Sequence, residues 1–241
     1  MAQGNPMQGV AIVSGGLDSV TMLYYLASKS YRPHVVSFDY DQRHKKELEY
    51  AERHAGILGL DWTVIDLEDY GQSIHDSTSS LVNPDVAVPE GHYAAETMKA
   101  TVVPNRNMVM TSIATGICIS EGGTYVAAAP HNGDAAIYPD CRPVFWRVLE
   151  RTIRTANEGF IDDKFFLLLP FLYKSKTDIA LEAKRLEVPV HLTWSCYAGR
   201  DIHCGRCGTC VERLEALHEA GVDDKTPYED SEFWRTQVAG V

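Results

Sequence analysis

The feature that most constrains this chain is a junction near its start, where an apolar run meets a glycine-rich turn. Residues 9–13 read GVAIV, residues 14–19 read SGGLDS, and a helix-forming stretch follows to Ser30. Such a turn brings backbone N–H groups close to an anion, and the positive end of the next helix points to the same place. The junction therefore predicts a strand, a phosphate-binding loop and a helix, with a tight turn and helix cap as the alternative interpretation.

Strands and helices are predicted to alternate along the rest of the chain. Further strands are expected over residues 34–40, 62–67, 124–130 and 165–170. Helices are expected over residues 45–60, 105–123, 144–159 and 176–188. This order favours parallel strands joined by helical crossovers, and ligands in such sheets bind at the carboxyl ends of the strands. The sequence thus predicts an α/β fold with a Rossmann-like parallel sheet.

One long segment, residues 68–104, interrupts this alternation. It is polar, contains three prolines and shows little periodicity. A connection of this length inside a compact domain is usually functional or disordered. We interpret it as an insertion that covers the substrate, and a surface excursion is the alternative.

Composition and charge exclude several classes of protein. The formal net charge of -11 argues against broad binding of nucleic acid, whose phosphates require a basic surface. No run approaches the roughly 18 apolar residues of a membrane span. The opening MAQGNPMQG lacks the basic start and apolar centre of a secretory signal. We therefore expect a cytoplasmic protein without nucleic-acid or membrane partners.

The cysteines are clustered near the end of the chain. Those that share a metal-ligand spacing are Cys196, Cys204, Cys207 and Cys210. Four thiolates can surround one Zn²⁺ tetrahedrally, and such a closed site is structural. An iron–sulfur cluster is the alternative, but the ferredoxin run continues with x3-C-P, and Leu214 stands here at the cysteine position. We interpret His203 as a neighbour of the metal and expect an ATP-binding domain over residues 9–190 and a zinc-binding segment over residues 191–241.

The stretch SGGLDS also matches the SGGxDS signature of the ATP pyrophosphatase (PP-loop) superfamily. This resemblance implies an adenine nucleotide alpha hydrolase-like fold, in which the loop grips the pyrophosphate that leaves when ATP adenylates a substrate. Ser14 and Ser19 would add hydroxyl donors, and Asp18 would hold Mg²⁺ on the phosphates. The ATP contacts that we expect are Val13, Ser14, Gly15, Gly16, Leu17, Asp18, Ser19, Phe38 and Arg43.

Further segments, in order, resemble the family of 7-cyano-7-deazaguanine (preQ0) synthases. They are DYDQRHKKE (39–47), VPNRN (103–107), YPDCRPVFW (138–146), PFLYKSKTDI (170–179) and TWSCY (193–197). The resemblance spans about residues 9–230, and Asp41 replaces the glycine usual in the first of these segments. It implies that 7-carboxy-7-deazaguanine is adenylated and then attacked by ammonia to give an amide. A second ATP then activates the amide, which becomes a nitrile used in queuosine biosynthesis. A homodimer is also implied.

The resemblance also indicates which residues meet the substrate. Asp18, Arg106 and Lys176 are expected to be catalytic. The expected substrate contacts are Arg106, His131, Asp134, Asp140 and Arg142. An arginine fork suits a carboxylate, and a lysine acts as a mobile point charge.

Each of these residues also has a structural interpretation. Arg43 and Lys176 are alternatively solvated surface charges, and Arg106 alternatively shapes a turn. Asp140 either recognises a guanine-like edge or pairs with Arg142. We interpret Trp194 and Tyr197 as packing around the metal.

Two other functions stay open from the sequence. One is a different PP-loop adenylating enzyme, such as a tRNA thiolase, which would need a reactive cysteine or a basic surface. The other is a recruited nucleotide-binding zinc protein that acts on a macromolecular partner.

Overall fold

Parallel strands form a five-stranded sheet in the order β3–β2–β1–β4–β5, in a computed structural model that describes residues 7–93 and 96–238. The strands are β1 (Gln8–Ile12), β2 (Arg32–Asp39), β3 (Trp62–Asp66), β4 (Tyr125–Ala127) and β5 (Phe166–Leu168). Every neighbouring pair is parallel, which confirms the predicted α/β class. Along the chain, β2 and β3 form on one side of β1, and β4 and β5 follow on its other side. The switch point therefore lies between β1 and β4, where a ligand site is expected.

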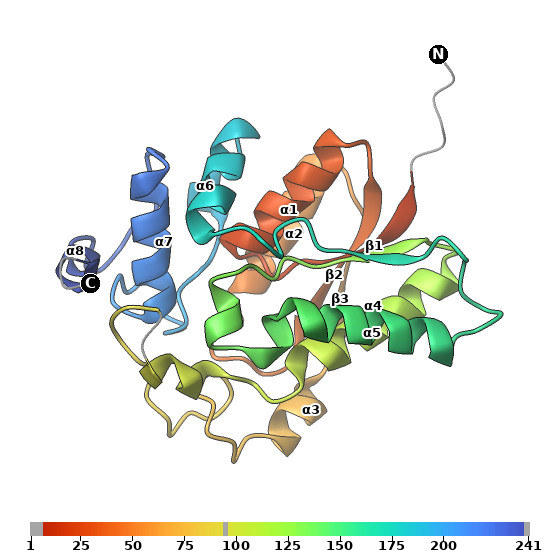
Figure 1. The fold of residues 1–241 in the computed structure, drawn as a ribbon. Coiled ribbons are helices and arrows are strands. Elements are labelled where there is room, and N and C mark those ends of the chain that lie inside the picture. Colours follow the sequence, from red (N-terminus) through yellow and green to blue (C-terminus); the bar gives the residue numbers. More distant parts are fainter. Residues whose placement is uncertain (1–6, 94–95, 239–241) are drawn as a thin grey trace.

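Helices cover both faces of this sheet (Figure 1). One face carries α1 (Leu17–Ser28), α2 (Glu47–Leu58) and α6 (Lys176–Arg185), and the other carries α4 (Arg106–Ser120) and α5 (Pro143–Ala156). Strand β1 is buried on both sides, because Ala11 belongs to the core under α1 and α6 while Val10 belongs to the core under α4 and α5. Burial on both faces explains why β1 is an unbroken apolar run.

The end of the chain adds two helices that the sequence did not predict. These are α7 (Gly208–Glu219), which lies beside α6, and α8 (Phe233–Val238), which lies on the other side of α7 (Figure 1). Ala216 and Leu217 of α7 join the core under α1 and α6. Arg213 is fully buried, and its guanidinium donates to the hydroxyls of Thr193 (2.6 Å) and Tyr228 (2.8 Å). The C-terminal segment is therefore packed on the sheet domain.

The buried guanidinium of Arg213 also has a charged partner. Its Nε lies 3.2 Å from Asp224 Oδ2. Burial alone would raise the pKa of Asp224, but Arg213 outweighs it and lowers that pKa to about 2. The pair satisfies both charges, which is the condition for burying them.

In its described parts, residues 68–93 and 96–104, the long segment consists mainly of turns and two short helices. These are α3 (Glu68–Ser73) and the 3-10 helix η1 (Glu96–Thr101). Arg43 holds the middle of the segment, because its guanidinium donates to the backbone carbonyls of Ser80, Asn83 and Val86 at 3.1 Å each. Shorter 3-10 helices are η2 (Asp134–Ala136), η3 (Pro139–Cys141) and η4 (Val190–Leu192).

Two expectations concern the chain's surroundings. In the described parts of the chain, no helix combines the length and the hydropathy that crossing a membrane requires. Residues 1–6, which make up most of the opening that lacks a secretory pattern, lie outside the described residues.

The turn after β1 depends on a glycine. Gly15 has φ +95°, and a Cβ added there would lie 2.0 Å from the carbonyl oxygen of Glu47 in α2. We predict that Gly15→Ala lowers the melting temperature by about 2–12 °C, since strained backbone costs of order 1–3 kcal/mol and each kcal/mol corresponds to about 2–4 °C in a chain of this length. Thermal unfolding followed by circular dichroism measures it.

Gly116 provides the matched control. It lies in the exposed middle of α4, and an added Cβ there would meet nothing within 4 Å. Gly116→Ala should therefore leave the melting temperature unchanged or raise it, because alanine favours helix more than glycine by about 1 kcal/mol. Equal melting of the two variants would contradict the packing described for Gly15.

Candidate active site

A cavity of about 220 Å³ opens at the switch point of the sheet. Its wall includes the loop after β1, the end of β2, the first turns of α2 and α4, the end of β4, and residues 194–197. Segments far apart in the sequence therefore meet at the carboxyl ends of the central strands. This is the position where parallel α/β sheets bind ligands.

The loop over residues 14–19 presents a cluster of small polar groups to the cavity. The hydroxyls of Ser14 and Ser19 lie 3.2 Å apart, and the backbone N–H of Gly16 donates to Ser14 Oγ at 3.3 Å. Gly16 is the N-cap of α1, and no side chain caps this helix. The N–H groups in the first turn of α1 are therefore available to a ligand, and the positive N-terminal end of the helix favours an anion there.

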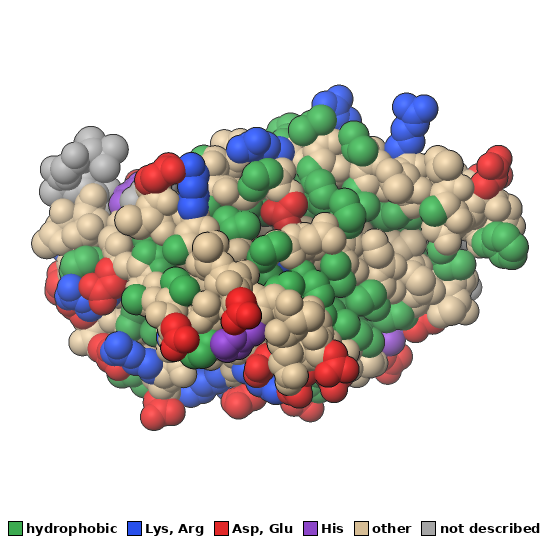
Figure 2. Space-filling model, turned by 90° about the horizontal axis from the view of Figure 1, so that it is seen from below, with side chains coloured by type: hydrophobic (Ala, Val, Ile, Leu, Met, Phe, Trp, Pro, Cys, Tyr) green, Lys and Arg blue, Asp and Glu red, His purple; other side chains and the backbone are tan. Residues whose placement is uncertain are grey.

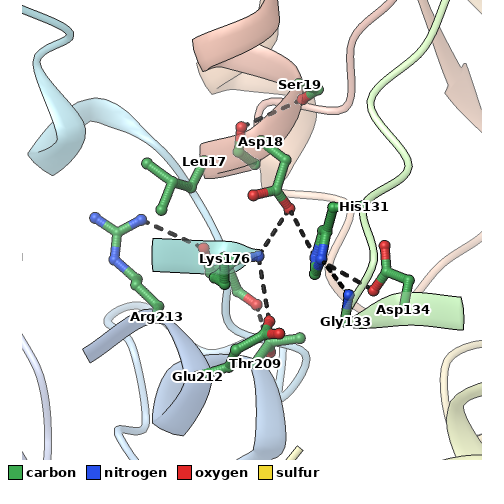
Figure 3. Close-up of polar contacts among 12 residues, drawn as sticks. Leu17, Asp18, Ser19, His131, Gly133, Asp134, Lys176, Thr209, Glu212 and Arg213 are labelled. Atoms are coloured by element: carbon green, nitrogen blue, oxygen red, sulfur yellow. Dashed lines mark hydrogen bonds and ion pairs between the residues drawn. The ribbon is translucent and has the colours of Figure 1, made fainter. Parts of the chain in front are cut away.

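A partly buried ion pair lies beside this loop (Figure 3). Lys176 Nζ lies 2.7 Å from Asp18 Oδ2 and 3.2 Å from Glu212 Oε2. Burial disfavours the charged forms, yet each partner outweighs it: the pKa of Lys176 is raised and the pKa of Asp18 is lowered. Asp18 Oδ1 is buried and has no hydrogen-bond partner. The ammonium is therefore kept charged at the edge of the phosphate loop.

His131 extends the same cluster toward η2. Its Nε2 lies 3.9 Å from Asp18 Oδ2 and 3.4 Å from Asp134 Oδ1, and its Nδ1 accepts the backbone N–H of Gly133 at 3.1 Å (Figure 3). Asp134 also accepts the hydroxyl of Tyr93 at 3.0 Å. Tyr93 belongs to the segment over residues 68–104, so that segment reaches the cavity wall.

A second group of titratable side chains faces Arg106 across the cavity. Glu47 Oε1 lies 3.5 Å from His44 Nε2, and Arg106 donates to the hydroxyl of Tyr40 over a long 3.4 Å contact. Burial raises the pKa of Glu47 to about 8, although Arg106 opposes the shift. Burial, helped by Arg106, lowers the pKa of His44 to about 3. Near neutral pH the histidine is uncharged and the glutamate titrates.

The structure brings most of the predicted site residues to this one cavity. Those in its wall are Val13, Ser14, Gly16, Leu17, Asp18, Ser19, Phe38, Arg106, Asp134 and Lys176. Gly15 instead packs on α2, and Arg43 binds the carbonyls of the long segment. Asp140 accepts the N–H of Asn107 at 3.4 Å, and Arg142 donates to the carbonyl of Ala135 at 3.0 Å. The structure therefore places none of these four residues among the cavity-lining groups, and His131 lies behind Asp134 rather than in the cavity wall.

Sequence reasoning missed several residues of the cavity wall. They are Tyr40, His44, Glu47, Tyr93 and Tyr138. Three of them lie in or beside the segment DYDQRHKKE, in which only Arg43 was singled out. The sequence signal that could have identified Glu47 is its position in the first turn of an amphipathic helix, on the buried face of that helix. Glu212 was missed because α7 was not predicted.

The cysteine cluster adjoins the cavity through Trp194. The Sγ atoms of Cys196, Cys204, Cys207 and Cys210 all lie within 4.8 Å of one another, and all four residues are buried. A tetrahedral Zn²⁺ with bonds of about 2.3 Å requires sulfur separations of about 3.8 Å, so the donor set fits a metal. Trp194 and Tyr197 pack on this cluster and also line the cavity.

His203 lies beside the four cysteines, and its ring forms a hydrogen bond with the backbone. Its Nε2 accepts the backbone N–H of Ser195 at 3.1 Å. Burial lowers the pKa of His203 to about 3, and its ring lies 4.4 Å from that of Trp194. Among the described residues, the group that could hold a metal consists of the four cysteines alone.

A parallel α/β sheet with an SGGLDS loop at its switch point defines a PP-loop ATP-binding protein. A model of the family "Queuosine biosynthesis protein QueC" matches residues 8–221. Relatives named 7-cyano-7-deazaguanine synthase, from Brucella ovis and Brucella suis, are 48% identical over 229 residues, which is 95% of this chain and 97% of theirs. The chain belongs to the QueC family.

Solved structures of other proteins are similar at lower identity. A 4-thiouridine synthetase in complex with RNA and bound ATP is 14% identical, with a TM-score of 0.49 over 89% of this chain and 50% of that one. NMN synthetase from Francisella tularensis is 14% identical, with a TM-score of 0.45 over 98% of this chain and 87% of that one.

Glu47 makes the stability of the fold depend on pH. Its pKa is about 8 in the folded chain, against 4.5 ordinarily, so the folded state holds this proton more tightly than the unfolded state. Stability contributed by Glu47 is therefore present below about pH 4.5 and lost as pH rises through 8. We predict that Glu47→Gln melts above the wild type at alkaline pH and that the difference shrinks toward pH 5. Thermal melts across pH measure it, and a difference independent of pH would contradict the burial argument.

Proposed function

We propose that this chain converts 7-carboxy-7-deazaguanine and ammonia into 7-cyano-7-deazaguanine with ATP, as the names of its 48% identical relatives indicate. The observation that carries the proposal is the shared cavity, whose wall holds both the SGGLDS loop and the guanidinium of Arg106. The loop suits the phosphates of ATP and the guanidinium suits the substrate's carboxylate. The reactants would therefore meet inside one cavity.

The reaction requires activation because a carboxylate is a poor electrophile. Attack of its oxygen on the α-phosphorus of ATP forms an acyl adenylate and releases pyrophosphate. Ammonia then displaces AMP and gives the amide. The amide oxygen attacks a second ATP, and loss of AMP leaves the nitrile. Each adenylation needs donors that stabilise the charge of the departing pyrophosphate.

The residues of the loop are proposed to supply those donors. The uncapped N–H groups at the start of α1 and the hydroxyls of Ser14 and Ser19 would bind the phosphates, while Val13 and Phe38 would contact the nucleoside. Lys176 would neutralise the departing pyrophosphate, since its charged Nζ lies 2.7 Å from Asp18 at the edge of the loop. Asp18 would hold Mg²⁺ through Oδ1, which is buried and has no protein partner. When bound, that ion would supply positive charge to the phosphates.

Arg106 is proposed to bind the substrate's carboxylate. Within the described residues, its guanidinium donates a long 3.4 Å hydrogen bond to the hydroxyl of Tyr40, which leaves donors for a bidentate carboxylate. Asp134 also lines the cavity, and His131 would fix its orientation. Asp140 would shape the start of α4, Arg142 would hold η2, and Arg43 would order the segment that reaches Tyr93.

The remaining proposals concern a second copy of the chain, nucleic acid and location. Val144 and Val148 lie one turn apart on α5 and are 56% and 60% exposed, which supports a homodimer that covers this face. Figure 2 shows hydrophobic side chains near the middle of the face seen from below and acidic side chains along its lower edge. The net charge of -11 supports a protein that does not bind nucleic acid. The cytoplasmic location and the division at residue 190 stay predictions.

Mass spectrometry of the products tests the proposed function. The protein is incubated with 7-carboxy-7-deazaguanine, ATP, Mg²⁺ and ammonium, and the expected product is the nitrile, with AMP and pyrophosphate. The reaction without ammonium is the control and should yield no amide or nitrile. ADP and phosphate as the nucleotide products, or unchanged carboxylate, would contradict the proposal.

Asp18 should be needed for pyrophosphate release. We predict that Asp18→Asn slows the release about 10- to 100-fold, because a charged contact contributes about 1.5–3 kcal/mol. Phosphorus NMR measures the release, and thermal melting checks that the variant is folded. The matched control is Asp69→Asn, which alters an exposed carboxylate of α3 and should release pyrophosphate at the wild-type rate. Wild-type release by a folded Asp18→Asn variant would remove Asp18 from the mechanism.

The cysteine cluster is proposed to hold one structural Zn²⁺ per chain. Because four thiolates close the tetrahedron, Cys207→Ser should lose the metal and lower the melting temperature. Metal analysis and thermal melting measure this, with Cys118→Ser as the control, since Cys118 is buried outside the cluster. That control should retain zinc. Iron with labile sulfide in the wild type would contradict the assignment of zinc, and full stability of Cys207→Ser with lost activity would contradict a structural role.

A further inference from the structure

One carboxyl group of the cavity is not used by the proposed adenylation. Glu47 lies in the first turn of α2, is 8% exposed and lines the same cavity as Asp18 and Arg106. Its position is fixed by the backbone, because Gly15 of the phosphate loop packs directly on the carbonyl of Glu47. The carboxyl is therefore held at a set place beside the loop.

The groups that face Glu47 come from several elements. From the loop before α2, the amide of Gln42 donates to Oε1 at 3.3 Å, and His44 Nε2 lies 3.5 Å from the same oxygen. Tyr40 after β2 and Arg106 of α4 interact electrostatically with the carboxyl. Tyr197 lies across from His44, with ring centroids 5.1 Å apart. His44 Nδ1 is buried and has no hydrogen-bond partner.

The other carboxyls in the cavity wall are bound differently. Asp18 is in an ion pair with Lys176 at 2.7 Å. Asp134 accepts the hydroxyl of Tyr93 at 3.0 Å and lies 3.4 Å from His131. Glu47 is held instead by the neutral amide of Gln42 and by His44, which is uncharged at neutral pH. A carboxyl held by neutral groups can gain and lose a proton without breaking an ion pair.

We propose that Glu47 is the general base that removes protons from the reacting nitrogen, an inference that rests on the proposed function. When ammonia displaces AMP from the acyl adenylate, the new C–N bond leaves an excess proton on nitrogen, and Glu47 accepts it. In the adenylated amide the nitrogen carries two hydrogens, and Glu47 first accepts one of them as a proton and passes it to water, which leaves a neutral imidate. The electrons of the remaining N–H bond then form the third C–N bond as the C–O bond breaks. The electron pair of that C–O bond leaves on the phosphate oxygen of AMP. The proton goes to Glu47 and then to water.

The chemistry of the carboxyl suits this role. A general base works best when its pKa lies near the working pH, and burial raises the pKa of Glu47 to about 8. An ordinary surface glutamate would bind a proton too weakly to accept one from nitrogen near neutral pH. His44 cannot take the proton itself, because its pKa is lowered to about 3.

The test compares products of Glu47→Gln and wild type from about pH 6 to about pH 9. The expected result is that nitrile formation falls about 10²- to 10⁴-fold, the usual contribution of a general base, and that acyl adenylate and amide accumulate ahead of the two steps that remove protons from nitrogen. At a constant concentration of free ammonia, the rise of the wild-type rate as pH approaches 8 should disappear in the variant. Pyrophosphate release from the carboxylate without ammonia should be retained, because that step needs no proton transfer from nitrogen. Glu49→Gln, an exposed neighbour on α2, is the control and should match the wild type.

Each outcome decides the inference. An unchanged amide-to-nitrile ratio with an unchanged pH profile would overturn it. Equal loss of pyrophosphate release and nitrile formation would also overturn it, because the role would then be in folding or binding. If Glu47→Gln does not fold, Glu47→Asp is expected to retain a pH-dependent rate at a lower level, and a rate independent of pH would contradict the proposal. A wild type that forms neither amide nor nitrile overturns the proposed function itself, whereas nitrile from the wild type with an unaltered variant overturns only the role of Glu47.

Discussion

The ion pair between Asp18 and Lys176 joins parts of the chain that are 158 residues apart. It links the phosphate loop to the start of α6, and Glu212 adds α7 to the same ammonium at 3.2 Å. Burying charges is costly unless they are paired, so neither side chain would be stable here alone. The pairing sets a cation at the edge of the loop before any nucleotide binds. The electrostatics of the cavity therefore depend on the packing of α6 and α7 against the sheet.

The glycine-rich loop couples the sheet to the rest of the cavity through its backbone. Gly15 has positive φ and lies against Glu47, while its carbonyl accepts the N–H of Trp194 at 2.9 Å. Trp194 in turn packs on the cysteine cluster. One tight turn thus fixes the position of a cavity carboxyl on one side and of the metal-binding segment on the other. A metal in that cluster would act on the cavity by holding Trp194 and Tyr197 in place.

Local sequence patterns predicted the parts of this structure that depend on local forces. The strands and the helices around them follow from apolar periodicity, and the loop follows from its glycines and its place between a strand and a helix. Parallel pairing followed from the alternation, because helical crossovers connect parallel strands. The cysteine spacing likewise predicted a cluster, and the four sulfur atoms lie within 4.8 Å of one another.

The parts that could not be predicted depend on distant contacts. Arg43 was assigned to ATP from its motif, but it binds carbonyls about 40 residues away, which no local pattern indicates. The altered pKa values of His44 and Glu47 arise from burial in the folded chain, which the local sequence, typical of an ordinary charged helix start, does not indicate. Glu212 belongs to the site because α7 lies beside Lys176 in the folded chain, a contact between elements that local sequence does not indicate.

The central claim is that the loop beside Asp18 and Lys176 activates a carboxylate by reversible adenylation. Exchange of labelled pyrophosphate into ATP, measured without ammonia, tests this step alone. We expect label to enter ATP when both 7-carboxy-7-deazaguanine and Mg²⁺ are present and not to enter when the carboxylate is left out. Label that enters ATP at the same rate without the carboxylate, or no exchange under any of these conditions, would contradict it.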